Sequence, residues 1–268
     1  MILVVVVTYY PDEELLRTNI ASIVERVDKI LIWENTPESE KEQFRFILHD
    51  KIEYCGDGVN SISRAFNYAW RYCKQKGYDF LLTMDQDSKW ESFDIFLTNT
   101  VYNSNAPFGI WCPQINENKN QNLFDARDSS ITSGMLIPIP ILDKIGGWDE
   151  FFTIDSVDTE FCSHARSLGV NIYSVANCQL VQRYGTPQIA HFWRYSFELR
   201  NDSPQRLYYI YRNYVIVMRR YPSIKSLQIG FKRVWLRKIK WIFFFEHQGT
   251  KKLLSIIHGI IDGFLKYK

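Results

Sequence analysis

Several motifs that mark common enzyme and binding classes are missing from this chain. It contains no CxxC, HExxH, GxSxG, GxGxxG or P-loop sequence. Its five cysteines are an odd number and lie far apart, which argues against a zinc knuckle or a disulfide framework and favours reduced thiols. No apolar run approaches the roughly 18 residues that a membrane-spanning helix needs. Folds stabilised by disulfides or by structural zinc, and folds that span a membrane, are therefore disfavoured.

Acidic residues are missing from one long stretch. No Asp or Glu occurs between Asp202 and Glu246, whereas Arg and Lys recur there, although the net charge of the whole chain is only +2. The charge asymmetry is therefore local, and the chain as a whole is not a general polyanion binder. Because no recognised nucleic-acid module accompanies the basic stretch, we expect no nucleic-acid partner.

The N-terminus lacks a basic stretch ahead of its apolar run, and that run is too short for the core of a signal peptide. We therefore expect a cytoplasmic protein. The run, at residues 2–7, is continuously apolar and β-branched, which predicts a strand buried on both faces.

Strands and helices alternate four times within the first 90 residues. The pattern predicts strands at 2–7, 29–33, 52–54 and 79–84, with helices at 13–26, 38–48 and 60–76. This alternation is typical of an α/β fold with a doubly wound, mostly parallel sheet, similar to a Rossmann nucleotide-binding half. Ligands of such sheets bind outside the carboxyl ends of the strands. We therefore expect one polar crevice formed by the loops at 8–11, 34–36, 56–60 and 85–87.

After residue 92 the alternation loosens. We expect a helix at 93–102, a strand at 135–141 and a helix at 156–168, followed after about residue 190 by helical, basic and aromatic sequence. The expected organisation is an α/β domain at 1–220 and a basic amphipathic helical extension at 221–268.

Two carboxylates, Asp85 and Asp87, follow the fourth predicted strand. One can bind a divalent cation while the other orients a water or a ribose hydroxyl, and Mg²⁺ and Mn²⁺ prefer such oxygen ligands and bridge diphosphates. An Asp-x-Asp motif alone fits a solvated turn equally well. Its position after a strand of an alternating α/β pattern favours a metal and diphosphate site.

Two further acidic features fit a ligand site. Glu34 ends the second strand, where it can accept the imide N–H of uracil or thymine, although a turn acid is the simpler explanation of that residue alone. Asp158 lies near the start of the helix at 156–168, where the helix dipole favours an acid. The dipole does not explain the whole acidic cluster, which indicates a site with Asp158 as a candidate general base: Asp149, Glu150, Asp155, Asp158 and Glu160.

Ordered motifs over residues 2–220 carry a family resemblance. They are VVVTY at 5–9, IWEN at 32–35, SRAFN at 63–67, LLTMDQDS at 81–88, SG at 133–134, GGWDEFF at 146–152, VDTEFC at 157–162 and SPQRLYY at 203–209. In this order the motifs resemble a family 2 glycosyltransferase of the GT-A fold, in particular the bacterial rhamnosyltransferase-like branch of polysaccharide biosynthesis.

The resemblance implies an inverting transfer of rhamnose or another hexose from a dTDP- or UDP-sugar to a hydroxyl of a polysaccharide or lipid-linked glycan. It implies a donor nucleotide site formed by Thr8, Tyr9, Glu34, Arg64 and Asp85. It implies a Mg²⁺ or Mn²⁺ ion on Asp87 and catalysis by Asp158 as the base. Residues that would face the donor or acceptor sugar are Ser133, Gly134, Trp148, Asp149 and Asp155.

The chain departs from the family pattern at three places, one of which is His164, where many relatives have an arginine six residues after the base. The usual Asn-x-Gly before the third helix is blurred to Val59-Asn60-Ser61, and a histidine found after the base region in many relatives is Gln182 here. The change at Gln182 predicts either weaker metal binding or recruitment of His191 as a metal ligand.

The basic stretch at 225–245 has two interpretations. Its apolar side chains would form one helical stripe, and most of its Lys and Arg lie off that stripe; the stripe is Leu227, Phe231, Val234, Trp235, Ile239 and Ile242. The pattern is typical of an interfacial helix on an anionic membrane surface, which would suit a peripheral protein at the inner face of the membrane. A helix packed on the catalytic domain, with Lys and Arg stems along its surface, explains it equally well.

Two alternatives to a glycosyltransferase remain open at this stage. A sugar nucleotidyltransferase shares the α/β nucleotide sheet, but it would need a glycine- and basic-rich loop after the first strand, where this chain has Thr8-Tyr9-Tyr10-Pro11. A non-catalytic sugar-nucleotide-binding protein would explain the departures at Val59 and Gln182 as lost activity.

Overall fold

The computed structural model describes most of the chain. The described residues are 1–116, 121–182, 188–192, 195–199, 201–230, 239, 242 and 246–265, and side chains are not described at 41–42, 188–192 and 195–199. The chain divides into two compact units, residues 1–183 and 184–268. Each unit is described by itself below.

The first half of the sheet in the first unit is parallel. Strands β1 (Ile2–Thr8), β2 (Lys29–Glu34), β3 (Ile52–Cys55) and β4 (Phe80–Asp85) lie in the order β3-β2-β1-β4. Every residue of β1 is buried, as its apolar run predicts. Thr8 pairs with Glu34, and Val7 pairs with Asp85. The register therefore brings the carboxyl ends of β1, β2 and β4 to one edge of the sheet, and this part of the expected fold is confirmed.

The second half of the sheet is mixed and continues the order as β8-β6-β9-β5, with β7 also paired to β9. Its strands are β5 (Ser88–Trp90), β6 (Ile110–Ile115), β7 (Phe124–Arg127), β8 (Leu136–Pro138) and β9 (Ile172–Gln182). β6 and β9 are parallel, whereas β8 runs antiparallel to β4 and β5 antiparallel to β9. The antiparallel pairing of β5 with β9 brings the C-terminal end of β9, at residues 180–182, beside residues 88–90, which follow β4 in the sequence.

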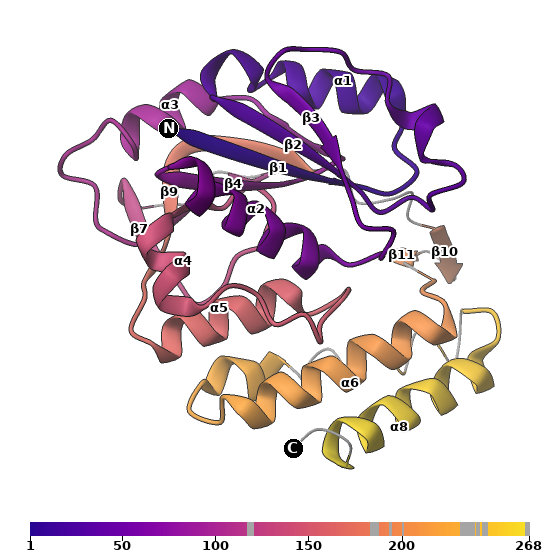
Figure 1. Ribbon diagram of the computed structural model, residues 1–268. Coiled ribbons are helices and arrows are strands. Elements are labelled where there is room, and N and C mark those ends of the chain that lie inside the picture. Colours follow the sequence, from indigo (N-terminus) through magenta and orange to yellow (C-terminus); the bar gives the residue numbers. More distant parts are fainter. Residues whose placement is uncertain are drawn as a thin grey trace. The chain divides into compact units, whose positions relative to one another are not determined.

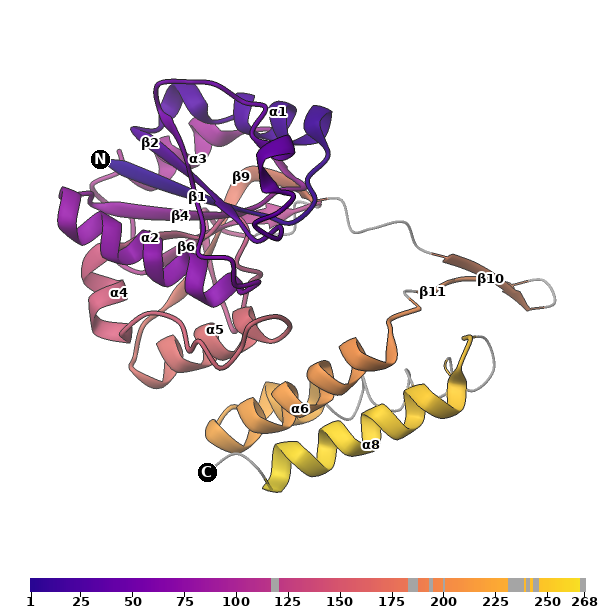
Figure 2. The same cartoon turned by 45° about the vertical axis from the view of Figure 1, so that its right-hand side comes forward.

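Helices cover both faces of this sheet (Figures 1 and 2). α1 (Glu13–Ala21) and α3 (Phe93–Asn99) lie on one face, and α2 (Ile62–Lys76), α4 (Ile139–Ile145) and α5 (Val157–Ser167) lie on the other. Side chains of the sheet pack with those of α1 and α3 in a continuous core that includes Val4, Val6, Ile20 and Phe96. A short 3-10 helix, η1 (Val24–Arg26), follows α1.

Two expected elements are wrong in part. The strand expected at 135–141 ends at Pro138, because α4 begins at Ile139 with Pro140 in its first turn, where a missing N–H costs nothing. The helix expected at 38–48 is only a 3-10 turn, η2 (Lys41–Phe44). Beyond it, the amide of Ile47 donates to the Tyr54 hydroxyl instead of a helical carbonyl. Tertiary contacts thus override the helical pattern there.

The second unit contains a hairpin and a helix pair. β10 (Gln188–Phe192) and β11 (Tyr195–Leu199) are antiparallel, and α6 (Pro204–Arg220) packs against α8 (Gly249–Leu265). The apolar centre of the pair is formed by Leu207, Tyr211, Ile242 and Ile256. The unit therefore begins before the boundary expected at residue 220, because α6 packs with α8.

The amphipathic helix expected at 225–245 falls largely outside the described residues. Residues 225–230 are helical, and Leu227 and Ile242 of the expected stripe are buried. Among the helices that the structure describes, none combines the length and apolarity needed to cross a bilayer.

Candidate functional site

The loops after β1 and β4 are joined by the middle residue of the Asp-Gln-Asp motif. The Gln86 side chain accepts from the backbone N–H of Tyr9 at 2.7 Å and donates to the Tyr9 carbonyl at 3.1 Å. Asn19 of α1 donates to the Gln86 carbonyl at 2.5 Å. Gln86 therefore fixes the loop that carries the two carboxylates, a role that the sequence pattern did not reveal.

Asp85 lies in a setting that disfavours its charged form. Burial, and to a smaller extent the nearby charges of Asp87 and Asp158, raise its pKa to about 7 against the lowering effect of a hydrogen bond from Gln182. Burial also raises the pKa of Asp87. The three predicted carboxylates of the metal and base sites, which come from two distant parts of the sequence, are therefore within electrostatic reach of one another.

Asp158 lies in the first turn of α5, as the sequence predicts. Its Oδ1 accepts from the backbone N–H of Thr159 at 2.7 Å. Burial raises its pKa, while hydrogen bonds from Thr159 lower it. The preceding residues, Asp155 and Ser156, have φ of 55° and 65° in the left-handed region. A sharp turn thus presents Asp158 near Asp85.

Ser133 and Gly134 support the motif from the neighbouring loop. Ser133 Oγ accepts from the backbone N–H of Asp85 at 3.0 Å and donates to Ser88 Oγ at 2.7 Å. Gly134 has a φ of 83°, and a Cβ there would lie 2.6 Å from Pro113. Both predicted sugar-loop residues therefore lie next to the carboxylates, where Ser133 positions the backbone of Asp85.

Glu34 is held by an arginine that the sequence analysis missed. Its buried carboxylate accepts from Arg45 Nε at 3.0 Å and from the terminal nitrogen of Arg45 at 2.7 Å. The two residues are close in sequence, but the contact depends on the irregular path after β2, which the predicted helix at 38–48 obscured.

Trp148 and Asp149 belong to the loop between α4 and α5. Trp148 exchanges two 2.8 Å hydrogen bonds with the Asn67 side chain through its backbone, and its ring is buried and stacked on Phe161 at 4.4 Å. The Asp149 carboxylate accepts from the backbone N–H of Phe151. Trp148, expected to face a sugar, therefore packs inside the unit and supports the loop that leads to Asp158.

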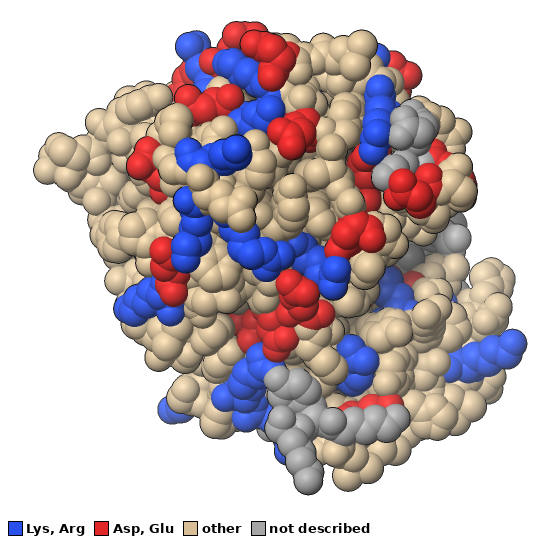
Figure 3. Space-filling view, viewed as in Figure 1, with Lys and Arg blue, Asp and Glu red and all other residues tan. Residues whose placement is uncertain are grey.

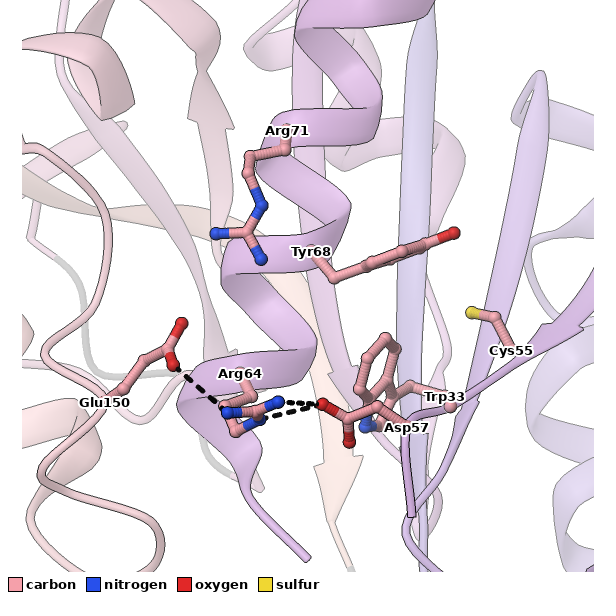
Figure 4. A pocket seen from close by; sticks show the side chains of 8 residues that line it. Trp33, Cys55, Asp57, Arg64, Tyr68, Arg71 and Glu150 are labelled. Atoms are coloured by element: carbon pink, nitrogen blue, oxygen red, sulfur yellow. Dashed lines mark hydrogen bonds and ion pairs between the residues drawn. The ribbon is translucent and has the colours of Figure 1, made fainter. Parts of the chain in front are cut away.

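A cavity of about 450 Å³ lies beside the carboxyl ends of β2 and β3 (Figure 4). Arg64 of α2 spans it, paired with Asp57 and at 3.7 Å from Glu150. Of the residues expected to bind the nucleotide, Arg64 alone lines it. The complete lining is Trp33, Cys55, Gly56, Asp57, Arg64, Tyr68, Arg71 and Glu150. Its aromatic walls and paired charges suit a planar polar ligand.

The cation site expected at Asp87 has two carboxylates, Asp85 and Asp87, within one motif. Within the part of the chain that the structure describes, no three His, Cys, Asp or Glu side chains group as a metal site. Asp85 and Asp87 instead have the amide of Gln182 as their neighbour, since its Nε2 donates to Asp85 Oδ2 at 2.9 Å. His191 lies in β10, and its side chain is outside the described residues.

Comparisons with known proteins concern the fold and the sequence as a whole. No protein-family model matches the chain. The chain is 25% identical over 245 residues to RfbF, a dTDP-rhamnosyl transferase of Shigella flexneri. The matched region covers 81% of this chain and 79% of RfbF.

Three solved structures match over 82–100% of this chain. A mannosyltransferase from Pyrobaculum calidifontis, in complex with GDP-Man and Mn²⁺, matches with a TM-score of 0.60 at 10% identity, over 100% of this chain and 88% of that one. S. aureus TarS 1–349 in complex with UDP-GlcNAc matches with a TM-score of 0.58 at 13% identity, over 98% of this chain and 81% of the TarS chain. GalNAc-T7 with UDP, GalNAc and Mn²⁺ matches with a TM-score of 0.58 at 11% identity over 82% of this chain, which spans only 47% of GalNAc-T7. The expected α/β fold of the GT-A type is confirmed.

Proposed function

We propose that the chain is a sugar-nucleotide-dependent glycosyltransferase of the family 2 type, and that it transfers rhamnose or another hexose from a dTDP- or UDP-sugar with inversion at the anomeric carbon. The rhamnosyl transferase relative supports this choice of donor. The observation that carries the proposal is that Asp87 and Asp158, from two distant parts of the sequence, both lie near enough to Asp85 at the end of β4 to raise its pKa.

The donor nucleotide would lie over the carboxyl ends of β1, β2 and β4. Thr8, Tyr9 and Glu34 would bind the base there, and Asp85 the ribose. Arg64 would contribute from the adjoining cavity, whose aromatic walls can contact a planar ring. The Arg45 ion pair would hold the Glu34 carboxylate in place for the base.

A divalent cation, Mg²⁺ or Mn²⁺, fits the residues present. The carboxylates of Asp85 and Asp87 are oxygen donors of the kind that both ions prefer. The two carboxylates lie close enough for Asp87 to raise the pKa of the buried Asp85, and a cation between them would offset this repulsion. Asp87 would hold the ion together with Asp85, and the ion would supply the charge that stabilises the leaving diphosphate.

Asp158 would act as the general base. It would take the proton of the acceptor hydroxyl while that oxygen forms a bond to the anomeric carbon and the bond to the diphosphate oxygen breaks. Its burial raises its pKa, which brings the carboxylate closer to the basicity that proton abstraction near neutral pH requires. Ser133, Gly134, Asp149 and Asp155 would line the sugar side of the site.

The acceptor would be a hydroxyl of a polysaccharide or of a lipid-linked glycan, and the protein would act in the cytoplasm, peripherally at the inner face of the membrane. Large apolar side chains of α8 are exposed at helical spacing, which supports contact with an anionic membrane surface. They are Leu254, Ile257, Ile261, Phe264 and Leu265.

Replacement of the proposed base tests this mechanism. Asp158→Asn should lower transfer by roughly 10²–10⁴-fold, because general-base catalysis contributes about that much. Binding of the donor, measured by the thermal shift that it causes, should not change. Asp128→Asn is the matched control, since Asp128 is exposed and paired with Arg166 in the same unit. Near-normal turnover by Asp158→Asn would refute the assignment.

The stereochemistry of the product gives a second, independent test. A single displacement produces the opposite anomeric configuration from that of the donor, which NMR of the product determines. Retention of configuration would contradict the proposal, whatever the effect of Asp158→Asn.

A further inference from the structure

The last residue of β9, Gln182, is held beside the Asp-Gln-Asp motif. Its backbone N–H donates to Asn116 Oδ1 at 3.1 Å, and its carbonyl accepts from Asn116 Nδ2 at 3.3 Å. In the sheet it pairs with Ser88, the residue that follows Asp87. Because its backbone is fixed on both sides, the position of its side chain is set by the fold.

The amide of Gln182 has one atom in use and one without a partner. Nε2 donates to Asp85 Oδ2 at 2.9 Å, the orientation that suits the ionised form of this carboxylate. The oxygen, Oε1, is buried and has no hydrogen-bond partner among the described residues. A buried acceptor without a partner costs free energy. The amide would therefore be more stable with a donor or a cation bound to Oε1.

The amide lies beside the motif that carries both carboxylates. It bonds to Asp85, and Gln182 is paired in the sheet with Ser88, the residue directly after Asp87. An NH₂ group has two protons, so it can face two carboxylates at once. The amide nitrogen thus lies where the two negative charges attract a positive group.

We propose that Gln182 is a ligand of the divalent cation, which its Oε1 would bind together with Asp85 and Asp87. In the structure the NH₂ group donates to Asp85. Rotation about the last side-chain torsion exchanges oxygen and nitrogen, and that torsion is broad with two nearly equivalent orientations. The resulting set of oxygen ligands would favour Mg²⁺ and Mn²⁺ over softer metals. This inference rests on the proposed function, which requires a cation at the diphosphate.

Direct binding of Mn²⁺ tests the inference without measuring turnover. Free and bound Mn²⁺ are separated by EPR, with the full chain titrated in the presence of dTDP or UDP. Gln182→Ala should raise the dissociation constant of Mn²⁺ by about tenfold or more, the lower end of the range for losses around metal sites. Gln179→Ala is the matched control, because Gln179 lies on the same strand, three residues away, and should leave the constant unchanged.

A second variant separates a ligand from a residue that only positions Asp85. Gln182→His should still bind Mn²⁺, and pulsed EPR of the bound ion should show a ¹⁴N coupling that the parent protein lacks. Thermal unfolding of each variant would identify a folding defect, and the histidine variant remains informative if the alanine variant does not fold.

The outcomes distinguish this inference from the proposed function. Equal Mn²⁺ affinity in Gln182→Ala, or bound Mn²⁺ without ¹⁴N coupling in Gln182→His, overturns Gln182 as a ligand while leaving glycosyl transfer intact. Failure of the parent protein to bind Mn²⁺ also overturns Gln182 as a ligand. Turnover of the donor, measured separately, then decides whether the proposed function holds. Mn²⁺ binding with a Gln182 effect but without turnover of any donor overturns the proposed function alone.

Discussion

At the scale of single residues, Asp85 links the chemistry of the site to the stability of the fold. Its pKa of about 7, raised mainly by burial, lies above the value of about 3.9 expected in an unfolded chain. The folded protein therefore binds the proton more tightly than the unfolded chain does. The stability that this group contributes is fully present below about pH 4 and is lost as the pH rises through about 7.

We therefore expect Asp85→Asn to raise the melting temperature of the metal-free protein at about pH 8 and to change it little at about pH 4. The amide keeps an oxygen that can accept from Gln182. Thermal unfolding in the presence of a chelator measures the difference between the two pH values. A lower melting temperature for Asp85→Asn at pH 8 would show that the carboxylate is not disfavoured by burial.

Asp125 provides a control of opposite sign. The backbone N–H of Gln121 and the side chain of Asn122 lower the pKa of its carboxylate. The stability it contributes is present above the unfolded pKa and is lost as the pH falls. Asp125→Asn should therefore lower the melting temperature at about pH 8 and not at low pH, the reverse of Asp85→Asn.

At the scale of elements, the loop between α4 and α5 depends on its contact with α2. Gly146 and Gly147 both have positive φ, of 84° and 82°. A Cβ on Gly147 would lie 2.5 Å from Asn67 Oδ1 and 2.7 Å from the Trp70 ring, whereas a Cβ on Gly146 would meet nothing within 4 Å. Adjacent glycines thus share the same backbone requirement but differ in the space around them.

This difference predicts two unequal substitutions. Gly146→Ala should cost about 1 kcal/mol, from the left-handed backbone alone. Gly147→Ala should cost more and should also slow transfer, because Asn67 and the loop that leads to Asp158 must shift. Denaturant unfolding and turnover measure the two effects. Equal costs for the two variants would mean that the contact with α2 does not position the loop.

The sequence predicted the parallel half of the sheet well and the mixed half poorly. Strands β1 to β4 are short apolar runs separated by helices, so both periodicity and order are readable locally. β5, β6, β7 and β9 were not predicted, because they are defined by pairing with distant partners. Residues 139–141 were included in the strand expected at 135–141, although α4 begins at Ile139.

The candidate site was predictable where it lies within one motif and unpredictable where it depends on distant contacts. Asp85 and Asp158 could be proposed from acids that follow a strand and begin a helix. Gln182 was recognised only as a departure from a family pattern, since its contact with Asp85 joins residues from distant parts of the chain. Arg45 was missed because the helix expected around it does not form.

At the scale of the whole molecule, charges of both signs are interspersed on the face shown in Figure 3, as the small net charge leads one to expect. An anionic membrane would therefore attract this protein through a local feature. In the second unit, α8 carries the exposed apolar side chains, with Lys251 beside them on the same helix.

We expect the full chain to sediment with vesicles that contain phosphatidylglycerol and less with pure phosphatidylcholine. The double substitution Leu254→Glu/Ile257→Glu should reduce this binding, because it places charge on the apolar face. Leu48→Glu makes the same kind of change at a leucine that is 91% exposed in the first unit, and should have no effect. Equal sedimentation of the double variant and the parent protein would rule out α8 as the contact.

The central claim is tested most directly by nucleotide release from a panel of dTDP- and UDP-hexoses, with Mg²⁺ or Mn²⁺ and with a chelator. We predict release of the nucleoside diphosphate from at least one donor, dependent on the cation and lost in Asp158→Asn. Binding of the nucleotide without release from any donor would contradict the account and favour a non-catalytic binder. Formation of a nucleoside triphosphate from donor and pyrophosphate would contradict it in favour of a nucleotidyltransferase.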